Sequence, residues 1–230
     1  MAMYADTHIH SALSPCAEEE MTPNNIVRMA VLNGLHLIAL TDHNSVMNCI
    51  PTATCAKKAG LKFIPGMELE TSEEIHVICL FKDIESALEM QENVWKRLPS
   101  PSNRTDIFGR QLVFDESDCI VDEVERLLSA PADIGIYQAA DMLTAIGGIM
   151  YPAHIQRNSY SILTNLGAIP EDLPVQYLEI TDMGGYNQCK GLGYPIIYSS
   201  DAHRLEGILS RERCKLPFPE AILTYPGCKE

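Results

Sequence analysis

Seven short apolar segments, most of which end in polar residues, constrain the fold of this 230-residue chain more than any other feature of its sequence. The segments cover residues 3–10, 36–43, 62–69, 74–81, 147–154, 175–182 and 195–203. Several are almost continuously apolar before their polar ends, which is typical of parallel strands covered on both faces of a sheet. Helical patterns lie between most of them. This alternation predicts an α/β barrel or an open, doubly wound sheet.

Five helices are predicted between these strands. The first is delimited by Thr22 as N-cap, Pro23 at the first helical position and Gly34 after the last turn. The others are predicted over residues 45–59, 85–97, 118–129 and 136–146. We interpret the whole chain, residues 1–230, as a single domain with a helical excursion around residues 84–135.

Charge and hydropathy limit the classes of function. The chain contains 17 Lys and Arg residues against 31 Asp and Glu residues, for a net charge of −14. Such a charge repels phosphate backbones, so long nucleic acid is not expected as a partner. No run approaches ~20 consecutive apolar residues, so no membrane span is expected. The first residues lack the basic and apolar regions of a secretory signal, and we therefore expect a cytoplasmic protein.

Histidines and carboxylates collect at the ends of the predicted strands. His8 and His10 are two residues apart on a strand, so both side chains point to one face and can reach one metal ion. Asp201 and His203 repeat this spacing at the last strand. Further candidates at strand ends are His43, Glu68 and His154. His36 lies at a strand start between two leucines and is interpreted as structural. Because the carboxyl ends of barrel strands form one rim, we predict a metal cluster there.

The types of ligand indicate which ions this cluster would hold. Imidazole and carboxylate groups without thiolate suit zinc, manganese or iron. The candidates are too many for one ion, so two or three divalent ions are predicted. The positive charge of these ions would exceed the negative charge of Glu68 and Asp201. The pocket would then be locally cationic, and a phosphate ester is the substrate that it favours.

The same residues, in the same order, resemble the polymerase and histidinol phosphatase (PHP) superfamily of metal-dependent phosphoesterases. The matching motifs are D-T-H-I-H-S (6–11), T-D-H-N (41–44), G-M-E (66–68), the histidine of E-I-H-V (74–77), P-A-H (152–154) and S-D-A-H (200–203). The resemblance implies a distorted seven-stranded (β/α)7 TIM-like barrel of PHP type, which agrees with the seven strands counted from the apolar pattern. It also implies a trinuclear metal centre.

The resemblance assigns ligands to each of the three ions. The first ion would be held by His8, His10, Glu68 and Asp201. Glu68 would bridge to a second ion, whose other ligands would be His76 and His154. The third ion would be held by His43 and His203. The assignment of His76 depends on the resemblance alone, because this residue falls near the start of its predicted strand.

One position departs from the family pattern. Many members carry an aspartate for the third ion where this chain has Pro15. Cys16, Glu18 or a neighbouring carboxylate could replace that ligand. Alternatively, the third site could be weak or empty.

The resulting hypothesis is a metal-dependent phosphoric ester hydrolase. Two ions that share a water would lower its pKa toward neutrality and direct the bridging hydroxide at phosphorus. The ions would also withdraw charge from the phosphate oxygens. His43 or His203 could protonate the leaving alkoxide. Arg157, three residues after His154, could clamp the phosphate, with Arg204 as a weaker candidate. The predicted substrate is a small phosphorylated metabolite or a nucleotide.

Several alternatives stay open at this point. Asp42 is expected to support the ligands rather than to bind a metal. Glu179 and Asp182 could bind substrate hydroxyls, orient ligands or cap the following turn. Two other functions are an amidohydrolase-like C–N hydrolase and a non-catalytic metal-binding or regulatory PHP module. Glu68 on the third strand, together with the additional T-D-H motif, favours phosphoester chemistry over amide hydrolysis.

Overall fold

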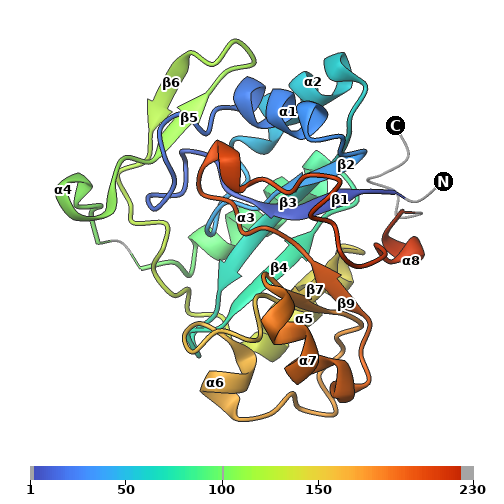
Figure 1. Ribbon diagram of the computed structural model, residues 1–230. Helices are drawn as coiled ribbons and strands as arrows, with labels where there is room; N and C mark the ends of the chain where they lie inside the picture. Colours follow the sequence, from blue (N-terminus) through green and yellow to red (C-terminus); the bar gives the residue numbers. More distant parts are fainter. Residues whose placement is uncertain (1–2, 100, 224–230) are drawn as a thin grey trace.

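A curled, five-stranded sheet forms the centre of the fold (Figure 1). The computed structural model describes residues 3–99 and 101–223. The sheet has the strand order β1-β2-β3-β4-β7. Its strands are β1 (Ala5–Ile9), β2 (Leu37–Leu40), β3 (Lys62–Glu70), β4 (His76–Leu80) and β7 (Ile149–Pro152). The first three are parallel, whereas β4 runs antiparallel to both β3 and β7.

Two further strands, β8 (Leu178–Ile180) and β9 (Ile196–Tyr198), form a parallel pair that completes the curl. Ile155 N donates to Glu179 O at 3.0 Å, which joins the end of β7 to β8. His10 N donates to Ala202 O at 2.9 Å, which joins the end of β1 to the segment after β9. All seven strands predicted from the apolar pattern are therefore present, and the α/β fold class is confirmed.

The direction of β4 corrects the expectation of parallel strands. Only residues 71–75 connect β3 to β4, and Thr71 N donates to Ile75 O at 2.9 Å within this turn. Parallel pairing needs a crossover of a dozen or more residues, so this short connection produces an antiparallel pair. The register sets Glu70 opposite His76. His76, although it begins its strand, therefore lies at the rim where β3 ends.

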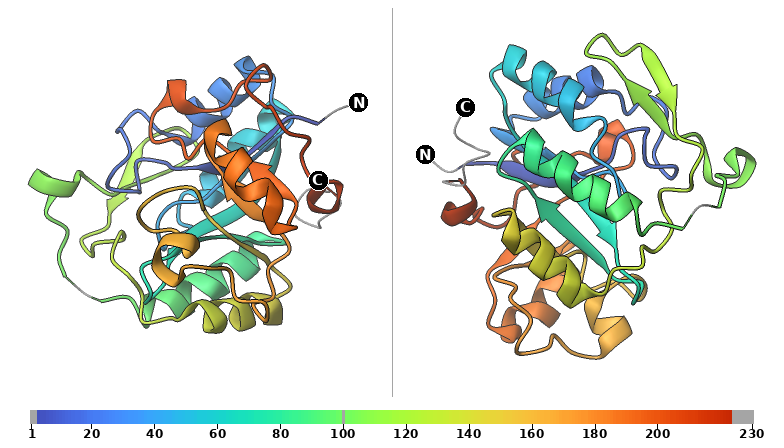
Figure 2. Two further views of the ribbon diagram at one scale, coloured as in Figure 1. Left: turned by 60° about the horizontal axis from the view of Figure 1, so that its bottom comes forward. Right: turned by 180° about the vertical axis from the view of Figure 1, so that it is seen from behind.

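Four of the five predicted helices are present. They are α1 (Pro23–Leu32), α2 (Cys49–Ala59), α3 (Ile84–Trp95) and α5 (Ile136–Ala145). Seen from behind, α3 and α5 lie in front of the sheet and α1 and α2 lie above them (Figure 2). Thr22 is the N-cap of α1, where its side chain accepts a hydrogen bond from Asn25 N, and Pro23 is the first helical residue, as predicted. Gly60 ends α2 in the left-handed conformation (φ 70°), which glycine adopts without steric penalty.

The helix predicted over residues 118–129 is wrong, because this region forms a β-hairpin. Its strands are β5 (Leu112–Phe114) and β6 (Ile120–Glu123). The Asp115 carboxylate accepts hydrogen bonds from Ser117 N and Cys119 N at 2.8 and 2.9 Å. Such local side-chain bonds compete with helix formation, and the β-branched residues that follow suit a strand. Residues 84–135 therefore combine α3, the short helix α4 (Thr105–Phe108) and the hairpin, rather than helices alone.

The remaining elements are short. They are α6 (Ile162–Leu166), α7 (Met183–Cys189), α8 (Glu220–Leu223) and two 3-10 helices over Lys190–Leu192 and Leu205–Gly207. Across residues 3–99 and 101–223, no helix has the length and apolarity needed to cross a membrane.

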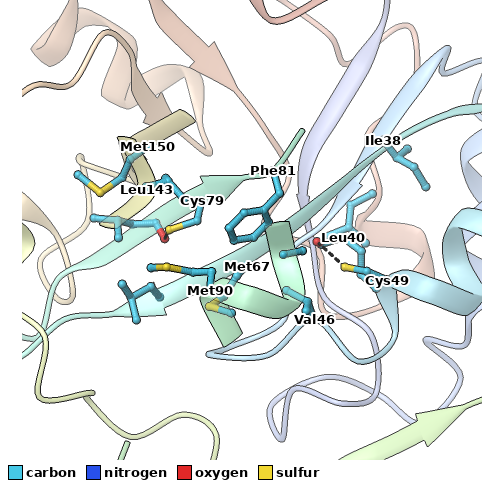
Figure 3. Close-up of a cluster of buried hydrophobic side chains, with 14 of the residues drawn as sticks. Ile38, Leu40, Val46, Cys49, Met67, Cys79, Phe81, Met90, Leu143 and Met150 are labelled. Atoms are coloured by element: carbon cyan, nitrogen blue, oxygen red, sulfur yellow. Dashed lines mark hydrogen bonds between the residues drawn. The ribbon is translucent and has the colours of Figure 1, made fainter. Parts of the chain in front are cut away.

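The main hydrophobic core lies between the sheet and the helices α1, α2, α3 and α5, and Figure 3 shows part of it. Fully buried side chains in it include Leu40, Val46, Met67, Phe81 and Met90. A second, smaller cluster lines the opposite side of the strands and includes Leu37, Ala39, Ile64, Ile78 and Tyr151. Successive residues of one strand therefore enter different clusters. Burial on both faces explains why the strand sequences are almost continuously apolar.

Candidate metal centre

Eight side chains that can ligate a metal converge where the parallel strands end. They are the eight predicted from the sequence: His8, His10, His43, Glu68, His76, His154, Asp201 and His203. All are buried except His203, which is partly exposed. Residues from β1, β3 and β4 meet the loops after β2, β7 and β9 at this rim.

Glu68 lies at the centre of the group, and its two carboxylate oxygens face different histidines. Oε1 is 2.9 Å from His76 Nδ1, 3.2 Å from His154 Nε2 and 3.3 Å from His8 Nε2. Oε2 is 3.1 Å from His43 Nδ1 and 3.3 Å from His10 Nε2. One carboxylate thus contacts five imidazoles from both sides of β3.

His8, His10 and Asp201 form the second part of the centre. The Nε2 atoms of the two histidines are 3.0 Å apart, and each lies 3.2 Å from Asp201 Oδ1. These three residues and Glu68 form a group whose ligating atoms all lie within 4.8 Å of one another.

Outer hydrogen bonds fix which nitrogen of each ring faces inward. Glu179 Oε2 is 2.9 Å from His8 Nδ1 and accepts a hydrogen bond from it. Ser14 Oγ is 2.9 Å from His10 Nδ1. Because the Ser14 hydroxyl donates a hydrogen bond to Asp42 Oδ1 at 2.8 Å, its oxygen accepts one from His10 Nδ1. Both histidines therefore carry a proton on the outward-facing Nδ1, and the Nε2 lone pair faces the cluster. This arrangement is typical of metal-binding histidines.

The inward-facing atoms fit a cation. The Nε2 lone pairs of His8 and His10 point toward each other and toward Asp201 Oδ1, which has no hydrogen-bond partner within the described residues. The buried His43 Nδ1 likewise has no such partner there. Converging lone pairs repel one another unless a positive charge lies between them. The residues thus fit a multinuclear metal site.

The third group consists of imidazoles only. The ligating nitrogens of His10, His43 and His203 lie within 4.8 Å of one another. The rings of His10 and His203 are stacked with centroids 4.3 Å apart. Of the expected replacements for the family aspartate at Pro15, Glu18 is exposed and pairs with Arg204 at 3.8 Å.

Cys16, the other expected replacement, has an exposed side chain and belongs to none of the groups of possible metal ligands found among the described residues.

The carboxylates determine the electrostatics of the centre. Burial opposes the charged form of Glu68, but the histidines, chiefly His76 and His8, lower its pKa well below the usual range. Burial likewise opposes a charged His8, but attraction to Glu179, Asp201 and Glu68 raises its pKa well above the usual range. The centre therefore favours positive charge, carried by protons or by metal ions.

Two candidate ligands and one neighbouring residue have unusual backbone conformations. His154, Asp201 and Tyr160 have positive φ angles of 29°, 53° and 54°. Non-glycine residues in this region are strained, and such strain is common at functional sites.

Three other residues predicted to act at the site lie at different distances from the centre. Arg157 Nη2 lies 2.6 Å from Asp201 Oδ2, so this arginine reaches the centre. Arg204 instead pairs with Glu18 and Glu206 at the surface. Asp42 is buried and accepts hydrogen bonds from Ser11 and Ser14, as a supporting residue would.

The two carboxylates left open on the sixth predicted strand have different roles. Glu179 orients His8, whereas Asp182 caps α7 by accepting a hydrogen bond from Gly185 N at 2.9 Å. His36 lies away from the cluster, where its Nδ1 accepts a hydrogen bond from Tyr4 N, in agreement with a structural role.

Sequence reasoning missed two residues of this centre, Ser14 and Tyr160. Ser14 lies in the loop after β1, and its hydroxyl links His10 to Asp42. Tyr160 stacks on His76 with ring centroids 4.7 Å apart. Tyr160 belongs to no recognisable motif, whereas Ser14 directly precedes Pro15, the position at which the chain departs from the family pattern. The sequence offers one weak signal, which is the proximity of Ser14 to His10 along the chain.

Together, these observations define an α/β protein with a buried histidine and carboxylate centre at the rim of a curled sheet. The PHP domain family matches residues 6–128, which is more than half of the chain. The chain belongs to this family.

Two related proteins match shorter stretches. An uncharacterized protein of Methanocaldococcus jannaschii is 33% identical over 105 residues, which cover 41% of this chain and 60% of that protein. A 5'-3' exoribonuclease of Haemophilus influenzae is 31% identical over 78 residues, which cover 33% of this chain and 27% of that protein. The matched regions thus span less than two thirds of either relative.

Solved structures share the fold at low sequence identity. The lesion-specific endonuclease EndoQ from Pyrococcus furiosus has a TM-score of 0.69 at 19% identity, over 99% of this chain and 56% of that chain. A protein of Bifidobacterium adolescentis, predicted to be a metal-dependent phosphoesterase, has a TM-score of 0.61 at 15% identity, over 93% of this chain and 94% of that chain. These likenesses support the fold.

Proposed function

We propose that this protein is a metal-dependent phosphoric ester hydrolase that acts on a small phosphorylated metabolite or nucleotide. The observation that carries the proposal is the position of Glu68 between five imidazoles. A carboxylate in this position would be shared by two ions, and paired ions are typical of enzymes that displace a group at phosphorus.

The proposed ligands follow the three groups of contacts. One ion would be held by His8, His10, Glu68 and Asp201, a second by Glu68, His76 and His154, and a third by His43 and His203 beside His10. Nitrogen and oxygen ligands of this kind suit zinc, manganese or iron. Bound ions would polarise the phosphoryl oxygens and make water a nucleophile near neutral pH.

Arg157 is the proposed phosphate clamp. Its guanidinium contacts Asp201 through one nitrogen, and 44% of its side chain is exposed. The remaining N–H groups can therefore donate to two oxygens of a phosphate, which is the geometry that guanidinium groups favour.

His43 and His203 are proposed as ligands that also handle protons. Burial, the largest effect, lowers the pKa of His203 to about 4 and that of His43 well below the usual range. Both rings are then neutral at pH 7, which is the form that binds metal. Protonation of the leaving alkoxide by either ring requires that it first receive a proton from solvent or substrate.

Nucleic acid is the second candidate substrate. The names of the matched endonuclease and exoribonuclease both refer to nucleic acids. Against this, the net charge of −14 opposes the approach of a long polyanion. Cleavage of an oligonucleotide at a rate above that of a small phosphate ester would favour this second candidate.

The first test combines metal content with phosphate release. The purified protein is analysed for bound metals, and hydrolysis of an aryl phosphate is measured with and without Mn²⁺ and a chelator. Two or three bound ions with chelator-sensitive turnover would support the proposal. Turnover of an amide panel instead would favour a C–N hydrolase. Bound metal with no turnover of any ester would favour a non-catalytic module.

Glu68→Ala tests the central carboxylate. We predict that it lowers kcat/KM by about 10³-fold or more, because the shared ligand is lost and several kcal/mol of transition-state stabilisation depend on the ions. The matched control is His36→Gln, which changes a histidine outside the cluster and should keep its metal content. Full turnover in Glu68→Ala would contradict the proposal.

A further inference from the structure

Tyr160 lies at the rim beside the metal centre, although it is not one of the candidate ligands. Its ring stacks on His76 with centroids 4.7 Å apart and an interplanar angle of 21°, while 46% of the residue is exposed. Tyrosine combines a large apolar ring with a polar tip, which makes it a common residue at binding surfaces.

The backbone of Tyr160 has a strained conformation that neighbouring hydrogen bonds maintain. Its φ of 54° is unfavourable for a bulky residue. Tyr160 O accepts a hydrogen bond from His76 N at 3.0 Å, and the next residue, Ser161, is buried and caps α6. The ring is therefore fixed before any ligand arrives, which lowers the entropic cost of binding.

Tyr160 and Arg157 lie at two ends of one loop beside the centre. Arg157 contacts Asp201, and Tyr160 contacts His76. The Ser161 hydroxyl donates to Arg157 O at 2.9 Å, which ties the two ends together. The loop thus carries both a cation and an aromatic ring that contact residues of the centre.

The spacing suits a phosphate that carries a ring at short range. His76 Nδ1 is 2.9 Å from Glu68, so a single imidazole separates the exposed ring of Tyr160 from the centre. In a nucleotide, likewise, a single sugar separates the planar ring of the base from the phosphate. Stacking is insensitive to the negative charge of the chain, because bases are neutral.

We infer that Tyr160 is a specificity-determining residue, whose exposed ring surface stacks on the base of a nucleotide while the phosphate binds at the metal centre. The inference rests on the proposed function. Since every base has an aromatic face, the stacking subsite selects for the presence of a base rather than for its identity.

The test compares a nucleoside 5'-monophosphate with ribose 5-phosphate, which has the same phosphate and sugar but no base. In the unaltered protein, kcat/KM for the nucleotide should exceed that for ribose 5-phosphate by about ten-fold, as expected for one stacked base. Tyr160→Leu should reduce this ratio to near one, mainly through a higher KM for the nucleotide. Tyr160→Phe, which keeps the ring, should retain the ratio.

Inhibition supplies a second readout. The free nucleoside should compete with ribose 5-phosphate in the unaltered protein and in Tyr160→Phe, and should lose this effect in Tyr160→Leu. An equal loss of activity toward both esters in Tyr160→Leu, or the absence of any preference in the unaltered protein, would overturn the inference. Hydrolysis of both esters without preference would leave the proposed function intact, whereas hydrolysis of no phosphate ester would overturn both.

Discussion

At the residue scale, Glu179 connects two parts of the centre from outside it. Its Oε2 accepts from His8 Nδ1 at 2.9 Å and from His154 N at 3.1 Å, and the side chain is fully buried. An amide at this position has no charge to hold the outward proton of His8. We predict that Glu179→Gln lowers the affinity for the first ion by about 10- to 100-fold. Competition with a chelating dye measures this.

Asp182→Asn is the matched control for this prediction. Asp182 caps α7 and lies three residues after Glu179. Because asparagine is also a good N-cap, this substitution should change neither metal affinity nor the free energy of unfolding by much. Equal losses of affinity in the two variants would show that Glu179 acts through general stability instead.

At the element scale, Gly66 determines how closely β2 and β3 can lie. A Cβ atom on Gly66 would be 2.7 Å from Thr41 Cγ2 and 3.0 Å from Leu40 O. Because this oxygen belongs to the backbone of β2, a Cβ here would push β2 and β3 apart near Glu68, which lies two residues further along β3. We predict that Gly66→Ala lowers the free energy of unfolding by about 1–3 kcal/mol, as overpacking does, measured by urea denaturation.

Gly191→Ala provides the comparison. Within residues 3–99 and 101–223, no heavy atom other than those of its chain neighbours lies within 4 Å of a Cβ at this position. The substitution should be neutral or slightly stabilising, because it reduces the freedom of the unfolded chain. If both alanine variants unfold at the same urea concentration, the close approach at Gly66 is not a constraint on β3.

At the scale of the whole molecule, the centre joins strands from both ends of the chain. His8 Nε2 lies 3.2 Å from Asp201 Oδ1, although the two residues are far apart in the sequence. A ligand that binds only the folded chain stabilises it, by about 2.7 kcal/mol at 100 times its Kd. We predict that Mn²⁺ raises the Tm and that a chelator lowers it. Glu68→Ala should show a smaller rise, and an equal rise in both proteins would place the stabilising ion elsewhere.

Much of the fold could be predicted because its signals are local. The apolar runs mark all seven strands, and Thr22 with Pro23 marks the start of α1. The side-chain alternation of a strand places His8 and His10 on one face without further information. The hairpin at residues 112–123 escaped prediction because Asp115 bonds to nearby backbone groups that a periodicity count ignores.

The sequence by itself therefore determined the strands, the fold class, the family and the set of candidate ligands. The tertiary structure decided how those residues meet. The antiparallel direction of β4 brings His76 to the rim, and the curl of the sheet sets Glu179 behind His8, 171 residues away in the chain. Periodicity and caps act between neighbours in sequence, whereas strand direction and long-range hydrogen bonds depend on how the whole chain packs.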